Sequence, residues 1–299
     1  MHIPYINYLK SKGRFAVWIF TFLFLLATIP LLLNANNTTT AKFFGVFVLV
    51  LIVFALWVWR IQTRKKADRL ARIRLTTNEV HWLNKHIPFY SNLNKEQKRI
   101  FEDRVGIFLA EIIVTEIDNE VPEKSTCLYV ASSAIIAYWG LPYWNYGELS
   151  EVLVYPSNFD MNNELNKRGL VSGKVHHGGL MDSTMILSLP TLIHGFDNQT
   201  DKNNVGVHEF AHLLDKADGS IYGLPFMLKA EDKQYWIDLV EREMTKIKDK
   251  DSTINAHGAT SKEEFFAVLT EYYKERPQLL KNKHPEIFLM MNRFFNEIN

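Results

Sequence analysis

The chain has 299 residues, a net charge of +1 at pH 7 and 47% hydrophobic residues, a composition that excludes a disordered or collagen-like protein. Its single cysteine excludes an intramolecular disulfide framework and fits a reducing compartment. The near-neutral average hides a segregation of charge. Residues 1–74 hold eleven basic residues and one acidic residue, which leaves 23 basic and 32 acidic residues in 75–299. We therefore expect the two parts to meet different environments.

Two uncharged runs near the N-terminus predict a transmembrane hairpin. Residues 15–33 and 43–59 contain no charged side chain, and as helices they would rise about 28 and 26 Å, close to a hydrocarbon core of about 30 Å. Two consecutive helices without a polar face are rare in soluble proteins. A cleaved signal peptide fits poorly, because no small-residue cleavage site follows the first run. The predicted layout is a hairpin with a basic juxtamembrane segment in 1–75 and a soluble domain in 76–299.

Lysine and arginine side chains predict the orientation of this hairpin. Three basic residues precede the first span and seven follow the second within fifteen residues, whereas the connecting loop has only Lys42. The positive-inside rule then places both termini in the cytoplasm, in a multi-pass protein of the cell inner membrane with two spans. We expect residues 60–74 to continue as a basic helix near the anionic headgroups of the lipid bilayer. This role accounts for the basic cluster, so we expect no direct contact with nucleic acid.

The segment 76–299 predicts one α+β domain, without internal repeats or low-complexity tracts. Its expected elements are a short helix in 79–91 that ends near Pro88, a helix at 95–112, an apolar helix or strand at 127–140, and buried strands at 151–157 and 183–189 separated by a loop rich in Asn and Gly. The first of these strands should stop at Pro156, because proline cannot donate a hydrogen bond to a sheet.

The sequence His-Glu-Phe-Ala-His occupies positions 208–212, in an apolar helical pattern. His208 and His212 are four residues apart, so both imidazoles lie on one face of a helix and can bind one tetrahedral metal ion. Glu209 lies beside that ion, where a general base can take a proton from an activated water molecule. Burying these three groups on an apolar helix without a role would be costly. The motif therefore predicts a site for Zn2+ in a metallopeptidase.

A zinc site of this kind needs a third ligand, and two carboxylates lie shortly after the motif. Asp218 is six residues beyond His212, but the chain reversal that would bring it back normally needs glycine where this sequence has Asp215. Asp215 itself suits a hydrogen-bond acceptor for an imidazole N–H, and it suits a surface carboxylate at a helix end equally well.

A second predicted helix, at 261–277, offers further candidates for the third ligand. Glu264 and Glu271 are seven residues apart and share one face of this helix. Ser261 and Glu264 also match a capping box, but Thr260 and Glu263 match one as well, so the cap does not require Glu264. Spacing alone favours Glu264, with Glu271 and Asp218 left open as alternatives.

These residues resemble the Mlc titration factor A family of zinc peptidases, from about Leu93 to the end of the chain. The likeness rests on HEFAHLLDKADG, on EEFFAVLTEYY some fifty residues later, and on VLVYPSNF and MILSL before them. The resemblance implies a zincin-like fold, zinc ligands His208, His212 and Glu264, and Glu209 as the general base.

The same resemblance draws attention to His257. Members of the family usually have a tyrosine seven residues before the ligand glutamate, where it is thought to stabilise the oxyanion, and this chain has His257 at that position. A histidine can donate the same hydrogen bond, and its protonation would make activity sensitive to pH. It is equally compatible with a loop residue that has no role.

Together these features predict a membrane-anchored zinc metallopeptidase that hydrolyses peptide bonds on the cytosolic side. Whether it cleaves internally or as an aminopeptidase stays open. An extended peptide could pair with the strand at 183–189, which could equally be ordinary core sheet. The resemblance also implies an alternative, because the family's founding member sequesters a transcriptional repressor. This chain would then be a regulatory binding protein that holds such a transcriptional regulator, or another partner, at the membrane.

Overall fold

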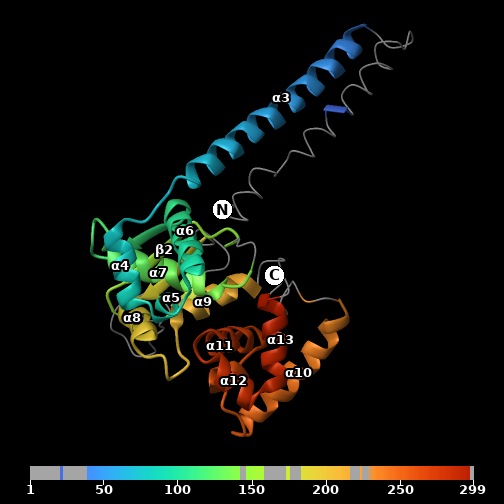
Figure 1. The fold of residues 1–299 in the computed structure, drawn as a ribbon. Helices are drawn as coiled ribbons and strands as arrows, with labels where there is room; N and C mark the ends of the chain where they lie inside the picture. Colours follow the sequence, from blue (N-terminus) through green and yellow to red (C-terminus); the bar gives the residue numbers. More distant parts are fainter. Residues whose placement is uncertain are drawn as a thin grey trace. The chain divides into compact units, whose positions relative to one another are not determined.

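The structure is a computed structural model, and it describes residues 21–22, 39–141, 146–157, 173–175, 183–215, 223, 228 and 230–296 (Figure 1). The chain divides into two compact units, Met1–Ile73 and Arg74–Asn299. The first predicted membrane span, at 15–33, lies outside the described residues except for Thr21 and Phe22. The two-helix hairpin therefore stays a prediction.

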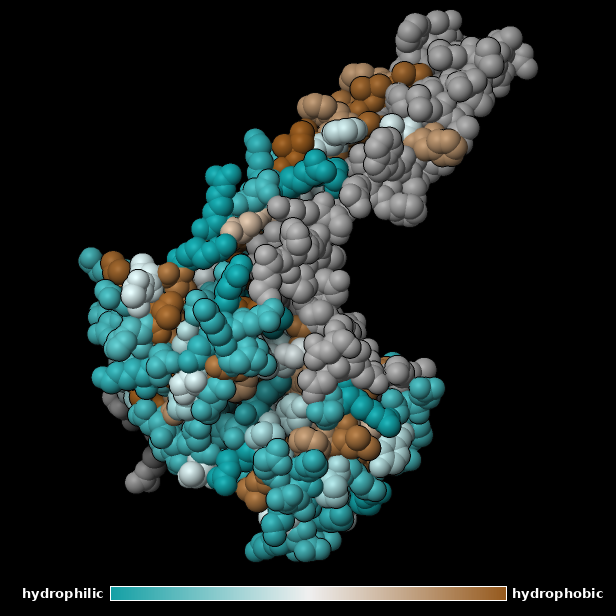
Figure 2. All heavy atoms as spheres, in the orientation of Figure 1, coloured by the Kyte–Doolittle hydropathy of each residue, from teal (hydrophilic) through white to brown (hydrophobic). Residues whose placement is uncertain are grey.

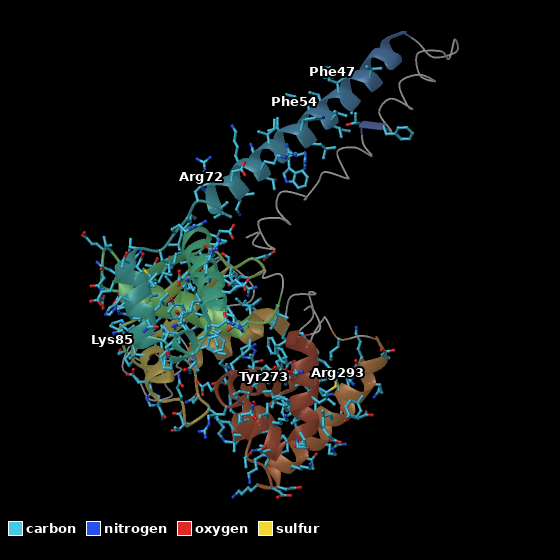
Figure 3. All side chains as sticks on the ribbon, in the orientation of Figure 1. Phe47, Phe54, Arg72, Lys85, Tyr273 and Arg293 are labelled. Carbon is cyan, nitrogen blue, oxygen red and sulfur yellow. The ribbon has the colours of Figure 1, made fainter. Side chains whose placement is uncertain are left out.

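Helix α3 (Thr39–Leu70) is the main described element of the first unit. Its portion Gly45–Leu70 is long and apolar enough to cross a membrane, and within the described residues it is the one helix with this property. Phe47 and Phe54 are 59% and 65% exposed, and Figure 3 labels both on this helix. Figure 2 shows hydrophobic residues along the same helix. The basic helix predicted at 60–74 is confirmed as far as Leu70, where α3 ends, and Arg72 and Arg74 lie beyond it. At 1.5 Å per residue α3 is about 48 Å long, more than the hydrocarbon core requires.

The second unit is mixed in its secondary structure, with many helices and a small sheet. Its helices and strands are α4 (Thr77–His86), α5 (Pro88–Ser91), α6 (Lys95–Glu111), β1 (Ile113–Glu116), α7 (Lys124–Ala137), β2 (Glu151–Tyr155), β3 (Gly173–Val175), β4 (Thr184–Ser188), α8 (Leu189–Asp197), α9 (Val205–Asp215), α10 (Ala230–Lys248), the short 3-10 helix η2 (Ala256–Ala259), α11 (Lys262–Glu275), α12 (Pro277–Lys283) and α13 (Pro285–Asn296).

Local sequence signals account for most of these boundaries. The side chains of Thr76 and Asn94 begin α4 and α6 as capping boxes. The helix predicted in 79–91 ends at His86, near Pro88 as expected, because a proline inside a helix removes a backbone donor, and the short helix α5 begins at Pro88. The ambiguous segment 127–140 is mostly helix α7, and strand β2 ends immediately before Pro156 as predicted.

The four strands form one sheet in the order β1-β2-β4-β3, in which β1, β2 and β4 are parallel and β3 is antiparallel to β4. Strand β3 lies inside the segment that the sequence predicts as a loop, because three residues are too few to show a periodic pattern. Both edges of β4 are already paired, to β2 and to β3. The prediction that a substrate peptide pairs with the strand at 183–189 is therefore wrong.

Close packing positions helix α9 in this unit. The ring centroid of Phe210 lies 5.7 Å from that of Phe108 on α6 and 5.8 Å from that of Tyr146. At Gly206 an added Cβ would come within 2.6 Å of Ser133 Cβ and 2.8 Å of Leu192 Cδ1, so α9 approaches α7 and α8 without room for a side chain. These contacts define where the other face of α9 points.

Candidate metal centre

Helix α9 carries both histidines of the motif on one face. Its first turn is capped by Asn204, whose Oδ1 accepts a hydrogen bond from the Val207 N–H at 3.1 Å. His212 Nε2 lies 3.1 Å from His208 Nε2, and the two ring centroids are 4.8 Å apart. The spacing of four residues thus brings the two imidazole nitrogens together as the sequence indicates.

Glu264, on helix α11, completes a group of three potential ligands. Its Oε2 lies 3.0 Å from His208 Nε2, and its Oε1 lies 3.5 Å from His212 Nε2. One donor atom from each of the three residues falls within 4.8 Å of the others, an arrangement that could hold a metal ion. Two imidazoles and one carboxylate form a donor set typical of catalytic zinc sites, which keep a fourth position open for water or substrate. The residues present therefore fit a zinc ion.

The start of helix α11 explains why the Glu264 carboxylate is directed to the histidines. Ser261 is the N-cap, and its hydroxyl accepts the Glu264 backbone N–H at 3.2 Å. Thr260 is not the cap, since its hydroxyl donates instead to the carbonyl oxygen of His257 at 2.7 Å. The cap uses only the backbone of Glu264, so its side chain can serve the metal site.

Glu271 lies on the far side of the His208 ring from Glu264. Its Oε1 is 2.7 Å from His208 Nδ1, and its Oε2 accepts the backbone N–H of Asn204 at 2.6 Å. The side chain is almost fully buried. A carboxylate on the second nitrogen of a ligand histidine fixes the tautomer and the orientation of the ring. The sequence predicts Glu271 only as an alternative ligand. Its position on the same helix face as Glu264, seven residues later, was the signal that it could instead support His208.

Of the two carboxylates that follow the motif, the structure describes Asp215. Asp215 is buried, with 1% of its surface exposed, and its Oδ2 accepts the Gly223 N–H at 2.9 Å. The surface-carboxylate interpretation is therefore wrong. The carbonyl of Gly223 in turn accepts from Trp236 Nε1 at 2.7 Å, which connects the end of α9 to α10. Asp218 lies outside the described residues.

Glu209 is buried beside the two histidines, with 7% of its surface exposed. Burial raises the pKa of its carboxyl above the ordinary value, although the charges of His208 and His212 act to lower it. A carboxylate in such surroundings is poorly solvated and is a stronger base than an exposed one.

His257, in the short helix η2, also reaches this cluster. Its Nε2 lies 2.8 Å from Glu264 Oε2, and its ring centroid is 5.8 Å from that of His208. The side chain of Asn255 accepts the His257 backbone N–H at 3.0 Å and so fixes the turn. His257 is 56% exposed, which places it at the solvent side of the cluster.

Comparison with known proteins identifies the family of this chain. Residues 59–296 match the model of the glucose-regulated metallo-peptidase M90 family. An uncharacterized protein of Synechocystis sp. is 28% identical over 72% of this chain and 83% of its own length. Mlc titration factor A of Yersinia enterocolitica is 24% identical over 81% of this chain and 90% of its own length. Mlc titration factor A of Serratia proteamaculans is 27% identical over 50% of this chain and 60% of its own length. The chain therefore belongs to the glucose-regulated metallo-peptidase M90 family and is a relative of Mlc titration factor A.

Proposed function

We propose that this protein is a zinc metallopeptidase with a zincin-like catalytic domain. The observation that carries the proposal is the convergence of His208, His212 and Glu264 within 4.8 Å, from two helices that the family model includes. These residues would hold Zn2+ and leave one position open. When bound, the zinc ion would polarise the scissile carbonyl and lower the pKa of the attacking water.

The protein side of the reaction is assigned to two further residues. Glu209 accepts the proton of the attacking water and delivers it to the leaving amine, and its burial beside the histidines suits a general base. His257 donates a hydrogen bond to the oxyanion that develops on the scissile carbonyl. Its Nε2 lies 2.8 Å from Glu264, and its exposed side chain faces the solvent side of the site, from which a substrate would enter.

The sheet suggests where a peptide binds. Within the described sheet β3 (Gly173–Val175) is the edge strand next to β4, and it packs against helix α9. An extended peptide can pair with the backbone of an edge strand. The substrate would then lie along β3, beside the metal site, rather than along β4.

We further propose that the domain at 76–299 is anchored to the cell inner membrane by residues 1–75 and works on the cytosolic side. Helix α3 supplies an apolar segment of sufficient length, and its basic continuation suits the cytosolic headgroups. The full chain should pellet with membranes after an alkaline carbonate wash. A chain that lacks residues 1–73 should stay in the supernatant, and its sedimentation with membranes would contradict the anchor.

The decisive experiment for the enzymatic proposal is Glu209→Gln, an isosteric change that removes the base. The purified variant should hold one zinc per chain by elemental analysis, as the wild type does, while cleavage of a peptide library falls about 100-fold to 10,000-fold. Glu263→Gln, one residue before the proposed ligand, is the matched control and should cleave normally. Undiminished turnover by Glu209→Gln would rule out this mechanism.

A second candidate function follows from the name of the relatives. Mlc titration factor A is named for a regulator, and this chain could bind a related transcriptional regulator at the membrane, with catalysis incidental. Binding should survive Glu209→Gln, whereas proteolysis should not. A deletion phenotype that Glu209→Gln fully complements would favour the binding function, and one that it does not complement would favour the peptidase.

A further inference from the structure

A cavity lies in the unit Arg74–Asn299, at the N-terminal end of helix α9. It has a volume of about 250 Å3 and is bounded by α5, α7, α8, α9 and the C-terminal end of α11. Most of its wall is apolar, and its lining includes Phe89, Leu93, Ile136, Phe196 and Val207. A cavity of this size can hold a small organic molecule as well as water.

Glu275 is the acidic residue of this lining, and its carboxyl group is unusual. Among the described residues, neither of its buried carboxylate oxygens has a hydrogen-bond partner in good geometry, although the Asn204 side chain lies close enough to lower its pKa. The nearby Nδ2 of Asn204 donates instead to the carbonyl of Gly195 at 3.1 Å. Buried carboxylates are normally paired or hydrogen-bonded, because the desolvation of an uncompensated charge is costly. A buried carboxyl group beside an apolar cavity therefore points to a missing cationic partner.

Lys274, the basic residue of the lining, does not serve as this partner. Its Nζ donates to the carbonyl of Trp139 at 2.6 Å and lies 3.3 Å from the centroid of the Phe295 ring. These contacts occupy the amine, and among the described residues no ion pair joins it to Glu275. The lysine therefore contributes mainly its methylene chain to the cavity.

We propose that this cavity binds a ligand with a primary ammonium group on a short apolar tail, with Glu275 as the counter-charge. The tail would contact the apolar wall, and the ammonium would pair with the carboxylate of Glu275. The terminal torsion of a glutamate side chain is soft, so a small rotation can turn an oxygen to the ligand. The amide oxygen of Asn204 already accepts the Val207 N–H. We therefore assign the contact with the ammonium group to Glu275 and not to Asn204.

Surrounding charges are consistent with this assignment. Burial, Glu271 and Asp201 raise the pKa of Glu275 to about 8, against the opposing effects of Asn204 and Arg276. Without a cation the group thus stays largely protonated near neutral pH, and an ammonium ligand would restore the ionised form.

The proposed ligand cavity and the hydrogen bonds that hold His208 share one residue, Asn204. Asn204 lines the cavity, and its backbone N–H donates to Glu271, which in turn contacts His208. The cavity is nevertheless distinct from the group formed by the Nε2 atoms of the two histidines and Glu264. Binding of the ligand does not depend on whether the protein is a peptidase.

The test uses three probes of the same length and different charge, n-pentylammonium, 1-pentanol and pentanoate. Ammonium chloride serves as a reference cation without an apolar tail. Titration calorimetry with the full chain in detergent should show n-pentylammonium binding at least ten times more tightly than the other two. Glu275→Gln should weaken n-pentylammonium at least tenfold and leave 1-pentanol unchanged. Leu93→Trp, which fills the cavity without changing its charge, should abolish the binding of all three probes. Glu96→Gln, on an exposed carboxylate of α6, should change nothing.

Three results would overturn the proposal. Equal affinities for n-pentylammonium and 1-pentanol would show that no charge is recognised. Tightest binding of pentanoate would identify Lys274 as the recognition group instead of Glu275. Binding of ammonium chloride as tight as that of n-pentylammonium would show that the apolar wall contributes nothing.

Discussion

The carboxylate of Glu271 lies 2.7 Å from the Nδ1 atom of His208, on the opposite side of the ring from Glu264. The same carboxylate accepts the backbone N–H of Asn204, the cap of the helix that carries both histidines. One buried side chain therefore fixes the ring of a proposed ligand and the start of its helix at the same time. This arrangement distinguishes the two glutamates that the sequence leaves as alternatives.

The first prediction concerns this support. Glu271→Gln keeps the size of the side chain, but its single oxygen cannot accept both N–H groups. Zinc affinity, measured by competition with a chelator, should fall about 10-fold to 100-fold. Thermal denaturation of the metal-free protein serves as the second readout. If the variant loses stability but binds zinc as tightly as the wild type, Glu271 has only a structural role.

The second prediction concerns the third ligand. Glu264→Ala should abolish stoichiometric zinc, because two imidazoles alone form a weak site. The N-cap bond of Ser261 uses the backbone of Glu264 and is unaffected, so the helix should persist. Circular dichroism checks the fold, and elemental analysis checks the metal. Glu263→Ala is the control, and full zinc content in Glu264→Ala would disprove the ligand assignment.

The third prediction concerns His257. If its ring donates a hydrogen bond to the oxyanion, His257→Phe should lower kcat about 100-fold or more with little change in zinc content. His257→Tyr restores a donor on an aromatic ring and should recover part of the loss. The measurement is peptide turnover at saturating substrate, with metal content determined in parallel. A large loss of zinc in His257→Phe would show instead that the histidine holds Glu264 in place.

The fourth prediction concerns the packing of helix α9. In Gly206→Ala the new methyl group would meet Ser133 Oγ and lie 2.8 Å from Leu192 Cδ1, so helices α7, α8 and α9 would have to move apart. We expect a loss of about 1–3 kcal/mol in the free energy of unfolding, measured by denaturant titration. At Gly258 an added Cβ would meet its nearest neighbour at an ordinary 3.5 Å. Gly258→Ala should therefore change stability little, and equal effects of both variants would contradict this account.

The fifth prediction concerns pH. The pKa of Glu275 is raised from 4.5 to about 8 by burial, by Glu271 and by Asp201, while Asn204 and Arg276 act to lower it. Between these pH values the unfolded chain releases a proton that the folded protein keeps, so this group makes the protein less stable as pH rises from about 4.5 to about 8.

The variant Glu275→Gln removes that dependence. Relative to the wild type, its melting temperature should be higher at pH 8.5 and nearly the same at pH 4.5, when thermal denaturation is followed in ligand-free buffer. Glu96→Gln, which alters an exposed carboxylate, should show no such difference between the two pH values. An equal shift of Glu275→Gln at both pH values would mean that the carboxyl group is not protonated near neutral pH.

The chain order of residues was enough to predict the parts of the site that depend on one helix. His208 and His212 lie together because a spacing of four residues is one helical turn. The end of β2 before Pro156 is likewise local, since it depends on residues within a few positions. The family resemblance, carried by the same motif, is confirmed by the match over residues 59–296.

Only the tertiary structure decided which side chains of different helices and strands meet. Glu264 and Glu271 share one face of α11 about 10.5 Å apart along its axis, and only the packing of α11 against α9 determines that the first meets Nε2 and the second meets Nδ1. The pairing of β4 on both edges and the cavity beside Glu275 have the same origin. Such contacts join residues distant in the chain, and neither the period of a helix nor the alternation of a strand encodes them.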